Sequence, residues 1–256
     1  MFVDSHCHLD FPELATQLDQ VVAKMRSMNV THALSVGVNP ADYPTLCTLI
    51  APYGHIFSSV GLHPEERSAK ETTIDQLIAC AATPKTVAIG ETGLDYYHVP
   101  EKAEWQRQRF RVHIRAAKQI KKPLIIHMRD ATEDTLRILR EERADEVGGV
   151  MHCFTGDWTA AEKALSLGFY ISFSGIVTFK NARETREAAQ RVPLERLLIE
   201  TDSPFLTPVP HRGKYPNEPA WIAHVAEEIA RLRDMPVEDI GRITAENFFR
   251  LFSTDS

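Results

Sequence analysis

The sequence of 256 residues has little of what marks several specialised classes of protein. Its four cysteines include no C-x-x-C pair, which excludes a disulfide framework and predicts reduced, mostly buried thiols. No apolar run approaches the roughly 18 residues of a membrane-spanning helix, and the first residues lack the basic and apolar regions of a signal peptide. We therefore expect a cytoplasmic protein that makes no contact with a membrane.

Positive charge is also scarce. The chain has 29 Lys and Arg against 35 Asp and Glu, a formal net charge of -6. This balance argues against a protein that coats long nucleic acids nonspecifically, although it leaves room for a small local phosphate site. With 43% hydrophobic and 25% charged residues, the composition excludes collagen-like and disordered chains and is typical of a globular protein.

What the sequence does contain is a regular alternation of two kinds of segment. Eight short apolar runs predict strands, and they recur at intervals of about 28 residues, close to the βα repeat of an eight-stranded barrel. The predicted strands are residues 2–4, 33–38, 57–62, 87–91, 124–127, 149–154, 170–176 and 197–202.

Longer segments with helical periodicity separate these runs. In one of them Trp105, Phe110, Ile114 and Ala117 recur near the helical period with Arg and Gln between them, which predicts a single buried apolar stripe. The predicted helices are residues 13–28, 43–52, 74–82, 101–120, 132–142, 159–167, 182–191 and 219–231, with an additional helix at 237–252. Strict alternation implies parallel strands with crossover helices, so we predict an α/β protein with the (β/α)8 TIM barrel fold, a single domain over residues 1–256.

The sharpest local motif is D-S-H-C-H-L-D at residues 4–10, where the first predicted strand ends. Side chains two positions apart on a strand share a face, so His6 and His8 should project together into the barrel mouth. An isolated H-x-H pattern is short and could equally be a pair of packing histidines.

Four more residues of metal-ligand type stand at strand ends: Glu91, His127, His152 and Asp202. The C-terminal strand ends of a barrel form its active-site face, so all six side chains should converge on one cavity. Burying that many polar groups without a metal would be costly. Six ligands exceed what one catalytic ion takes from protein, which predicts two divalent ions. Glu91 is the candidate bridge, since a carboxylate can bind both.

Further polar residues surround this set. Asp95 and Glu200 are candidates to orient a metal-bound imidazole, and for Asp95 a role in holding its loop is equally open. His63, Arg129, Arg212 and Lys214 could bind a phosphate, although a solvated loop charge explains any one of the cations as well. His32, His55, His98, His113 and His224 lack such neighbours, and no functional role is predicted for them.

These motifs together resemble the TatD family of metal-dependent deoxyribonucleases, in the amidohydrolase-like TIM barrel group. The resemblance rests on the motif at residues 4–10 with G-E-T-G-L-D-Y at 90–96, H-M-R-D at 127–130, H-C-F-T-G at 152–156 and E-T-D-S-P at 200–204. F-S-G-I-V-T-F-K-N at 173–181 and P-V-P-H-R-G-K at 208–214 resemble the bacterial YcfH-like branch. The resemblance implies that His6, His8, Glu91 and Asp202 hold one ion, and that Glu91, His127 and His152 hold the other.

The predicted function is hydrolysis of phosphodiester bonds by a water that two metal ions activate, most simply in a TatD-type deoxyribonuclease that acts as an exonuclease. Asp202 would be a metal ligand and the general base. The substrate would be single-stranded DNA or a DNA end, and no obligate protein partner is evident. Mg²⁺, Mn²⁺ and Zn²⁺ all remain candidates. Two alternatives stay open: a two-metal hydrolase of a small ester, lactone or amide, and a module that binds nucleic-acid ends without cutting.

Overall fold

The computed structural model describes residues 1–67, 70–99 and 104–254, and in these ranges eight strands form a single sheet. The strands run in the order β1 to β8, and every neighbouring pair is parallel. They are β1 (Phe2–Cys7), β2 (Val30–Gly37), β3 (Ile56–Val60), β4 (Thr86–Asp95), β5 (Leu124–Arg129), β6 (Gly149–Met151), β7 (Tyr170–Phe173) and β8 (Leu197–Ile199). The prediction of eight parallel strands is confirmed.

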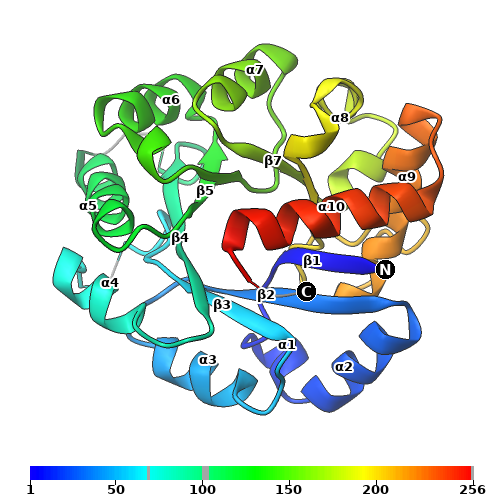
Figure 1. The fold of residues 1–256 in the computed structure, drawn as a ribbon, viewed down its shortest axis with the longest axis horizontal. Helices are drawn as coiled ribbons and strands as arrows, with labels where there is room; N and C mark the ends of the chain where they lie inside the picture. Colours follow the sequence, from blue (N-terminus) through cyan, green and yellow to red (C-terminus); the bar gives the residue numbers. More distant parts are fainter. Residues whose placement is uncertain (68–69, 100–103, 255–256) are drawn as a thin grey trace.

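Helices surround this sheet on the outside (Figure 1). The α-helices are α1 (Pro12–Ala15), α2 (Leu18–Ser27), α3 (Tyr43–Ile50), α4 (Ile74–Cys80), α5 (Glu104–Ile120), α6 (Thr132–Glu141), α7 (Trp158–Ser166), α8 (Arg183–Arg191), α9 (Ile222–Arg233) and α10 (Val237–Phe252). Short 3₁₀ helices are η1 (Ala144–Glu146), η2 (Gly175–Thr178), η3 (Leu194–Arg196) and η4 (Pro219–Trp221). Among the described residues, none of these helices has the length and apolar character needed to cross a membrane.

The barrel closes where β1 meets the segment after β8. Cys7 and Ser203 form a parallel bridge, and the His8 amide donates to the Ser203 carbonyl at 2.8 Å. The Asp202 amide donates to the His6 carbonyl at 2.9 Å. These bonds nearly close the ring of strands, and they bring two ends of the chain together at one edge of the barrel mouth.

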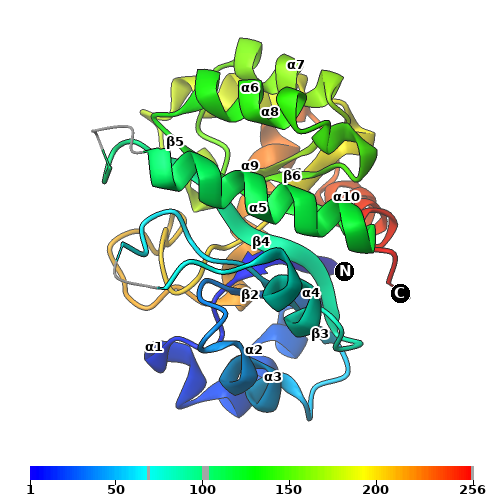
Figure 2. The same ribbon diagram turned by 90° about the vertical axis from the view of Figure 1, so that its left-hand side faces the viewer.

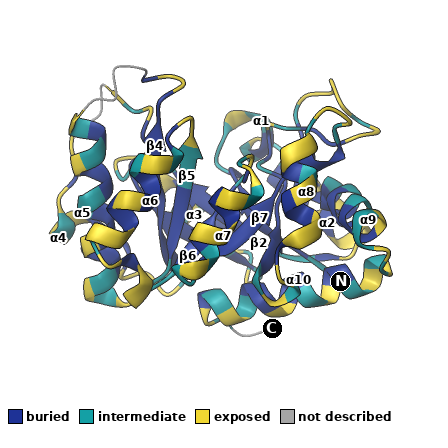
Figure 3. Cartoon of the chain, turned by 90° about the horizontal axis from the view of Figure 1, so that it is seen from above, coloured by how far each residue is buried: buried dark blue, intermediate teal, exposed yellow. Residues whose placement is uncertain are grey.

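The apolar core has two layers. The larger layer lies between strands and outer helices, so the helices are buried on their inner sides and exposed on their outer sides (Figure 3). The smaller layer fills the barrel interior, where Val3, Leu34 and Leu198 meet Phe248 and Phe252 of α10. Because α10 packs against β1 at Met1 and Phe2, it covers the end of the barrel where the strands begin. The opposite end, where the strands finish, is left for the polar residues.

Strand β4 is longer than the sequence predicts. Glu91 was expected to end it, but the strand continues to Asp95. The reason lies in Gly93, which has φ of 143° and passes so close to β5 that an added Cβ would lie 2.0 Å from the His127 carbonyl oxygen. Gly and Asp usually signal a turn, whereas here the glycine allows two strands to approach closely. Glu91 is therefore held inside the sheet beside His127.

Three strands in the second half of the chain end three residues earlier than predicted. The predicted strands 149–154, 170–176 and 197–202 end at Met151, Phe173 and Ile199. Cys153 and Asp202 have φ of 43° and 53°, in the left-handed region, which an extended strand does not contain. The chain after β7 turns into η2 instead. His152 and Asp202 thus lie just beyond their strands, on segments that turn into the barrel mouth.

Most of the predicted helices are present in the structure, but several begin or end at other residues than predicted. The segment 13–28 is two helices, α1 and α2, and the Thr16 hydroxyl between them bonds back to the Pro12 carbonyl at 2.9 Å. The segment 219–231 begins as η4 before α9. Residues 101–103 of the predicted helix 101–120 lie outside the described residues, and α5 covers the rest.

One face of α5 is more polar than predicted. The apolar stripe is present, but Gln106, Arg109 and His113 are buried as well. They hold the chain that follows β3: the His113 Nε2 accepts from the Leu62 amide at 2.9 Å, and Arg109 donates to the His63 carbonyl at 2.7 Å. Figure 2 shows that α5 also lies alongside β4, which it contacts. The helix therefore fixes the loop that leads into the barrel mouth.

His113 predicts a pH dependence of stability. Burial lowers the pKa of this imidazole to about 4 from 6.5. Between these two pH values His113 is protonated in the unfolded chain but not in the folded chain. The free energy of unfolding should therefore fall as pH drops from 6.5 towards 4, by up to about 3 kcal/mol. In His113→Gln this component should vanish, and the pH slope of the unfolding free energy, measured by denaturant titration, should become shallower. Equal slopes for both proteins would contradict this assignment.

Candidate metal centre

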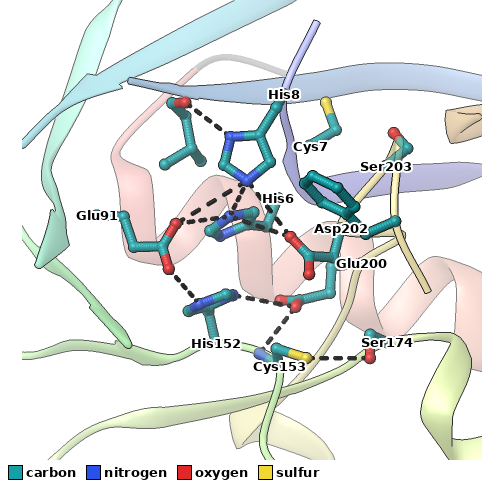
Figure 4. Close-up of polar contacts among 12 residues, drawn as sticks. His6, Cys7, His8, Glu91, His152, Cys153, Ser174, Glu200, Asp202 and Ser203 are labelled. Atoms are coloured by element: carbon teal, nitrogen blue, oxygen red, sulfur yellow. Dashed lines mark hydrogen bonds and ion pairs between the residues drawn. The ribbon is translucent and has the colours of Figure 1, made fainter. Parts of the chain in front are cut away.

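The six predicted ligands meet at the C-terminal end of the barrel. They line or underlie a cavity of about 830 Å³, together with residues of the surrounding loops. His6 is on β1 with His8 directly after it, Glu91 is on β4, His127 is on β5, and His152 and Asp202 follow β6 and β8. Figure 4 shows the side chains of His6, His8, Glu91, His152 and Asp202 turned towards one another.

Glu91 is the centre of this cluster. Its Oε2 lies 3.3 Å from the His6 Nε2 and 4.0 Å from the His8 Nε2. Its Oε1 lies 2.9 Å from the His127 Nδ1 and 2.7 Å from the His152 Nε2. One oxygen of the carboxylate thus faces the imidazoles of His6 and His8, and the other faces those of His127 and His152.

Asp202 completes the side of the cluster that faces β1. Its Oδ1 lies 3.6 Å from the His6 Nε2 and 3.4 Å from the His8 Nε2. The two imidazole nitrogens are themselves 3.3 Å apart. Three donor atoms from two distant parts of the chain therefore converge on one point next to the Glu91 carboxylate.

An irregularity in β1 contributes to this geometry. Val3 belongs to the barrel interior and Cys7 to the outer core, although strict alternation would put both on one face. The pairing of β1 with β2 shifts between Asp4 and Cys7, which accounts for the change of face. His6 and His8 consequently point into the barrel mouth, as the H-x-H pattern predicts.

Two buried carboxylates contact the imidazoles from behind. The Asp95 Oδ2 lies 2.9 Å from the His127 Nε2, and its other oxygen accepts from the His98 amide at 2.7 Å. The Glu200 Oε1 lies 3.3 Å from the His152 Nδ1 and accepts from the Cys153 amide at 2.8 Å. Each carboxylate thus fixes both an imidazole and a nearby loop, so for Asp95 the two predicted roles occur together.

Asp4 is a residue whose position the sequence analysis did not explain. It is fully buried, and its Oδ1 accepts from the Thr201 amide at 2.9 Å while its Oδ2 accepts from the Thr201 hydroxyl at 2.5 Å. Burial raises its pKa to about 8 despite these bonds. The carboxyl ties β1 to the residue before Asp202. Its signal in the sequence is an acid at the end of the first predicted strand, two residues before His6.

The charge state of the cluster favours cation binding. Burial alone would raise the pKa of Glu91, but the imidazoles of His152, His63 and His127 outweigh it and hold the pKa well below its usual range. The pKa of Asp202 is lowered too, because the bond from His8 and the charges of His6 and His8 overcome burial. Both carboxylates are therefore ionised at neutral pH, which a metal ligand requires.

Two buried polar atoms support the fit of a metal. The His6 Nδ1 and the Glu200 Oε2 are among the buried side-chain polar atoms of the described residues that have no hydrogen-bond partner. Leaving such atoms unpaired costs free energy, and a nearby cation compensates a buried carboxylate. Imidazole nitrogens and carboxylate oxygens are also the donors that Zn²⁺ and Mn²⁺ accept. The residues present therefore fit divalent cations.

The four predicted phosphate-binding residues fall into two groups. His63 joins the cluster, with its Nε2 3.1 Å from the Glu91 Oε1, so it is also a candidate metal ligand. Arg129 lines the cavity, and its guanidinium lies 4.1 Å from the centre of the Tyr97 ring. Arg212 and Lys214 are exposed and are not among the described residues that line the cavity. The Arg212 guanidinium lies over a phenylalanine ring instead, 4.0 Å from its centre.

The barrel and this donor set define a metal-dependent hydrolase. Known proteins agree with that class. A family model described as TatD related DNase matches residues 3–253. An Escherichia coli K12 protein named uncharacterized metal-dependent hydrolase YcfH is 47% identical over 257 residues, covering 99% of this chain and 96% of its own. The chain belongs to the TatD family.

Two further relatives agree with this assignment. The crystal structure of YjjV, a TatD homologue from E. coli K12, superimposes with a TM-score of 0.92 at 28% identity, covering 99% of this chain and 98% of its own. A Citrobacter rodentium protein named 3'-5' ssDNA/RNA exonuclease TatD is 33% identical over 239 residues, covering 91% of each chain. The expected resemblance to TatD proteins of the YcfH-like branch is thus confirmed.

Asp95 gives a test of the donor arrangement. Asp95→Asn removes the negative charge behind His127, so affinity for Mn²⁺ or Zn²⁺ should fall by roughly 10- to 100-fold. Competition with a fluorescent chelator measures this affinity on metal-stripped protein. Asp130→Asn changes an exposed carboxylate of the same cavity and is the matched control, expected to bind metal almost as the parent does. Equal affinities for the parent and Asp95→Asn would contradict the arrangement.

Proposed function

We propose that the chain is a TatD-type deoxyribonuclease that hydrolyses phosphodiester bonds with two divalent cations. The observation that carries the proposal is the Glu91 carboxylate, whose Oε2 faces His6 and His8 while its Oε1 faces His127 and His152. This supports a division in which His6, His8, Glu91 and Asp202 hold one ion and Glu91, His127 and His152 hold the other. Bound cations would supply a Lewis acid for water and for the phosphoryl oxygens.

The charge of the cavity also supports a metal-dependent phosphodiesterase. Of the described residues that line it, Arg129 is the only Lys or Arg, whereas five are Asp or Glu. Such a lining repels a phosphodiester at neutral pH. Phosphate binding in this cavity therefore requires the divalent cations in addition to Arg129.

Asp202 is the general base in this proposal. Its side chain is 15% exposed and lines the cavity, while its Oδ1 stays within 3.6 Å of the His6 Nε2. Its lowered pKa keeps the carboxylate ionised, so that an oxygen is available to accept a proton from a water in the cavity. As the water oxygen bonds to phosphorus, one water proton would pass to the Asp202 carboxylate and the P–O bond to the leaving nucleoside oxygen would break. That oxygen would take a proton from solvent in the cavity, to which Asp202 would return its own.

The dimensions of the cavity favour the end of a strand as the substrate. About 830 Å³ is in the range of pockets that enclose a small ligand, so it would admit a terminal nucleotide rather than a continuous duplex. The relative named as a 3'-5' ssDNA/RNA exonuclease supports a single-stranded end, with DNA and RNA both possible. We propose single-stranded or frayed DNA ends as the substrate.

Glu91→Gln tests this proposal. The substitution removes the negative charge shared by both ions, so cleavage should fall by at least about 10³-fold. Purified protein, stripped and reloaded with Mg²⁺ or Mn²⁺, is incubated with end-labelled single-stranded oligonucleotides, and shortening is followed on gels. Glu66→Gln alters another cavity carboxylate and should keep most of the activity. Full activity in Glu91→Gln would contradict the mechanism, and tight binding without cleavage would favour the non-cutting module.

A second candidate is hydrolysis of a small ester, lactone or amide, because apolar residues such as Met128 and Ile176 share the cavity with the polar cluster. Substitution of Arg129 distinguishes this function from phosphodiester hydrolysis. For a phosphodiester substrate, Arg129→Ala should raise KM by about tenfold through loss of a charge-assisted contact. Arg212→Ala, outside the cavity lining, should have the smaller effect. Faster turnover of neutral esters than of any oligonucleotide, unchanged in Arg129→Ala, would favour the small-molecule hydrolase.

A further inference from the structure

Aromatic side chains border the metal cluster on the side of β1 and β8. Phe11 stacks on the His8 ring with 4.9 Å between ring centres, and Phe205 meets Phe11 edge to face at 5.8 Å. Tyr215 follows at 6.5 Å from Phe205. We call Phe11, Phe205 and Tyr215 the aromatic step. It begins at the metal-ligand cluster and ends in solvent.

The exposure of this step is unusual. Phe205 is 43% exposed and Tyr215 is 59% exposed. Among the described residues six large hydrophobic side chains are exposed, and Phe205, Val209 and Tyr215 supply half of them from one short segment. An apolar group left in water at the mouth of a cavity marks a surface that a ligand covers.

The step is also fixed in place relative to the metal ligands. The Phe205 amide donates to the Asp202 carbonyl at 2.9 Å, and the Asn217 side chain donates to the Phe205 carbonyl at 2.6 Å. The Tyr215 hydroxyl donates to a Glu13 carboxylate oxygen at 2.8 Å. Phe205 is therefore anchored three residues from Asp202, and its ring stays beside the cavity that both residues line.

The other side of the cavity carries the charge. Arg129 lies on β5, which is four strands away from β1 in the eight-stranded ring, and it stacks on Tyr97. A strand that crosses the mouth would thus meet aromatic rings on one side, the metal ligands in the middle and a guanidinium beyond them. A nucleotide has the matching order of groups: a flat base, a phosphodiester and a second phosphate.

We propose that the aromatic step is a base-binding subsite, in which the base of the terminal nucleotide stacks on Phe205 while its phosphodiester lies at the metal ligands. The proposal rests on the proposed phosphodiesterase function and specifies its substrate. A stacking platform accepts any base, because every base has a π-face, and it needs that face to be unpaired. The subsite therefore selects single-stranded ends without reading their sequence.

The experiment uses the full-length chain loaded with Mn²⁺ and two octanucleotides. One carries thymine at both terminal nucleotides, and the other carries a tetrahydrofuran abasic residue at both. The parent protein should cleave the first with a kcat/KM about tenfold higher, mainly through KM, because only the first can stack. Phe205→Ala should lose this preference, whereas Phe205→Trp should keep it. Val209→Ala, an exposed apolar residue of the same segment outside the step, should behave as the parent does.

The outcomes separate this inference from the function on which it rests. A preference for the base-bearing end that persists in Phe205→Ala would overturn the subsite, as would equal cleavage of both octanucleotides by the parent, while the phosphodiesterase function would stand. If the parent cleaves neither octanucleotide with Mn²⁺ or Mg²⁺, the proposed function fails and the subsite fails with it. Loss of activity on both substrates in Phe205→Ala, with an unfolding transition like the parent's and unchanged Mn²⁺ affinity, would make Phe205 a general positioning residue instead.

Discussion

The contact between one buried carboxylate and the imidazoles around it is the interaction on which the rest of the site depends. Glu91 is fully enclosed by protein, yet its pKa is held well below its usual range by the surrounding histidines in spite of burial. Its oxygens lie within 2.7 to 4.0 Å of imidazole nitrogens from four other parts of the barrel, at β1, β5 and the segments after β3 and β6. An arrangement of this kind is expensive to bury unless cations occupy it, so the fold and the metal requirement are physically linked.

Several distant parts of the molecule serve to keep this contact in place. Asp4 joins β1 to Thr201, which precedes the ligand Asp202. Arg109 and His113 of α5 hold the loop that carries His63. At the other end of the barrel, Phe248 and Phe252 of α10 belong to the apolar cluster of the interior, whereas the polar cluster lines the cavity at the mouth. A rigid apolar base and a polar mouth are what the TIM barrel offers to catalysis.

Much of this arrangement follows from the sequence, because strand and helix periodicity repeat eight times and the ligand-type residues stand at the strand ends. The ends of the strands were less predictable. Gly93 looks like a turn residue but permits close strand packing, and the left-handed φ of Cys153 occurs together with a hydrogen bond from its amide to the distant Glu200. The buried polar face of α5 could not be predicted either. Gln106 and Arg109 are residue types that usually face solvent, and only the structure shows the backbone carbonyls to which they donate. The closeness of His63 to Glu91 and the aromatic step depend on loop conformation, which periodicity does not encode.

The most direct test of the account is anomalous diffraction from crystals of the protein grown with saturating Mn²⁺. We expect two Mn²⁺ peaks on opposite sides of the Glu91 carboxylate, one beside His6, His8 and Asp202 and the other beside His127 and His152. A single peak remote from Glu91, or no peak within coordinating distance of these side chains, would contradict it.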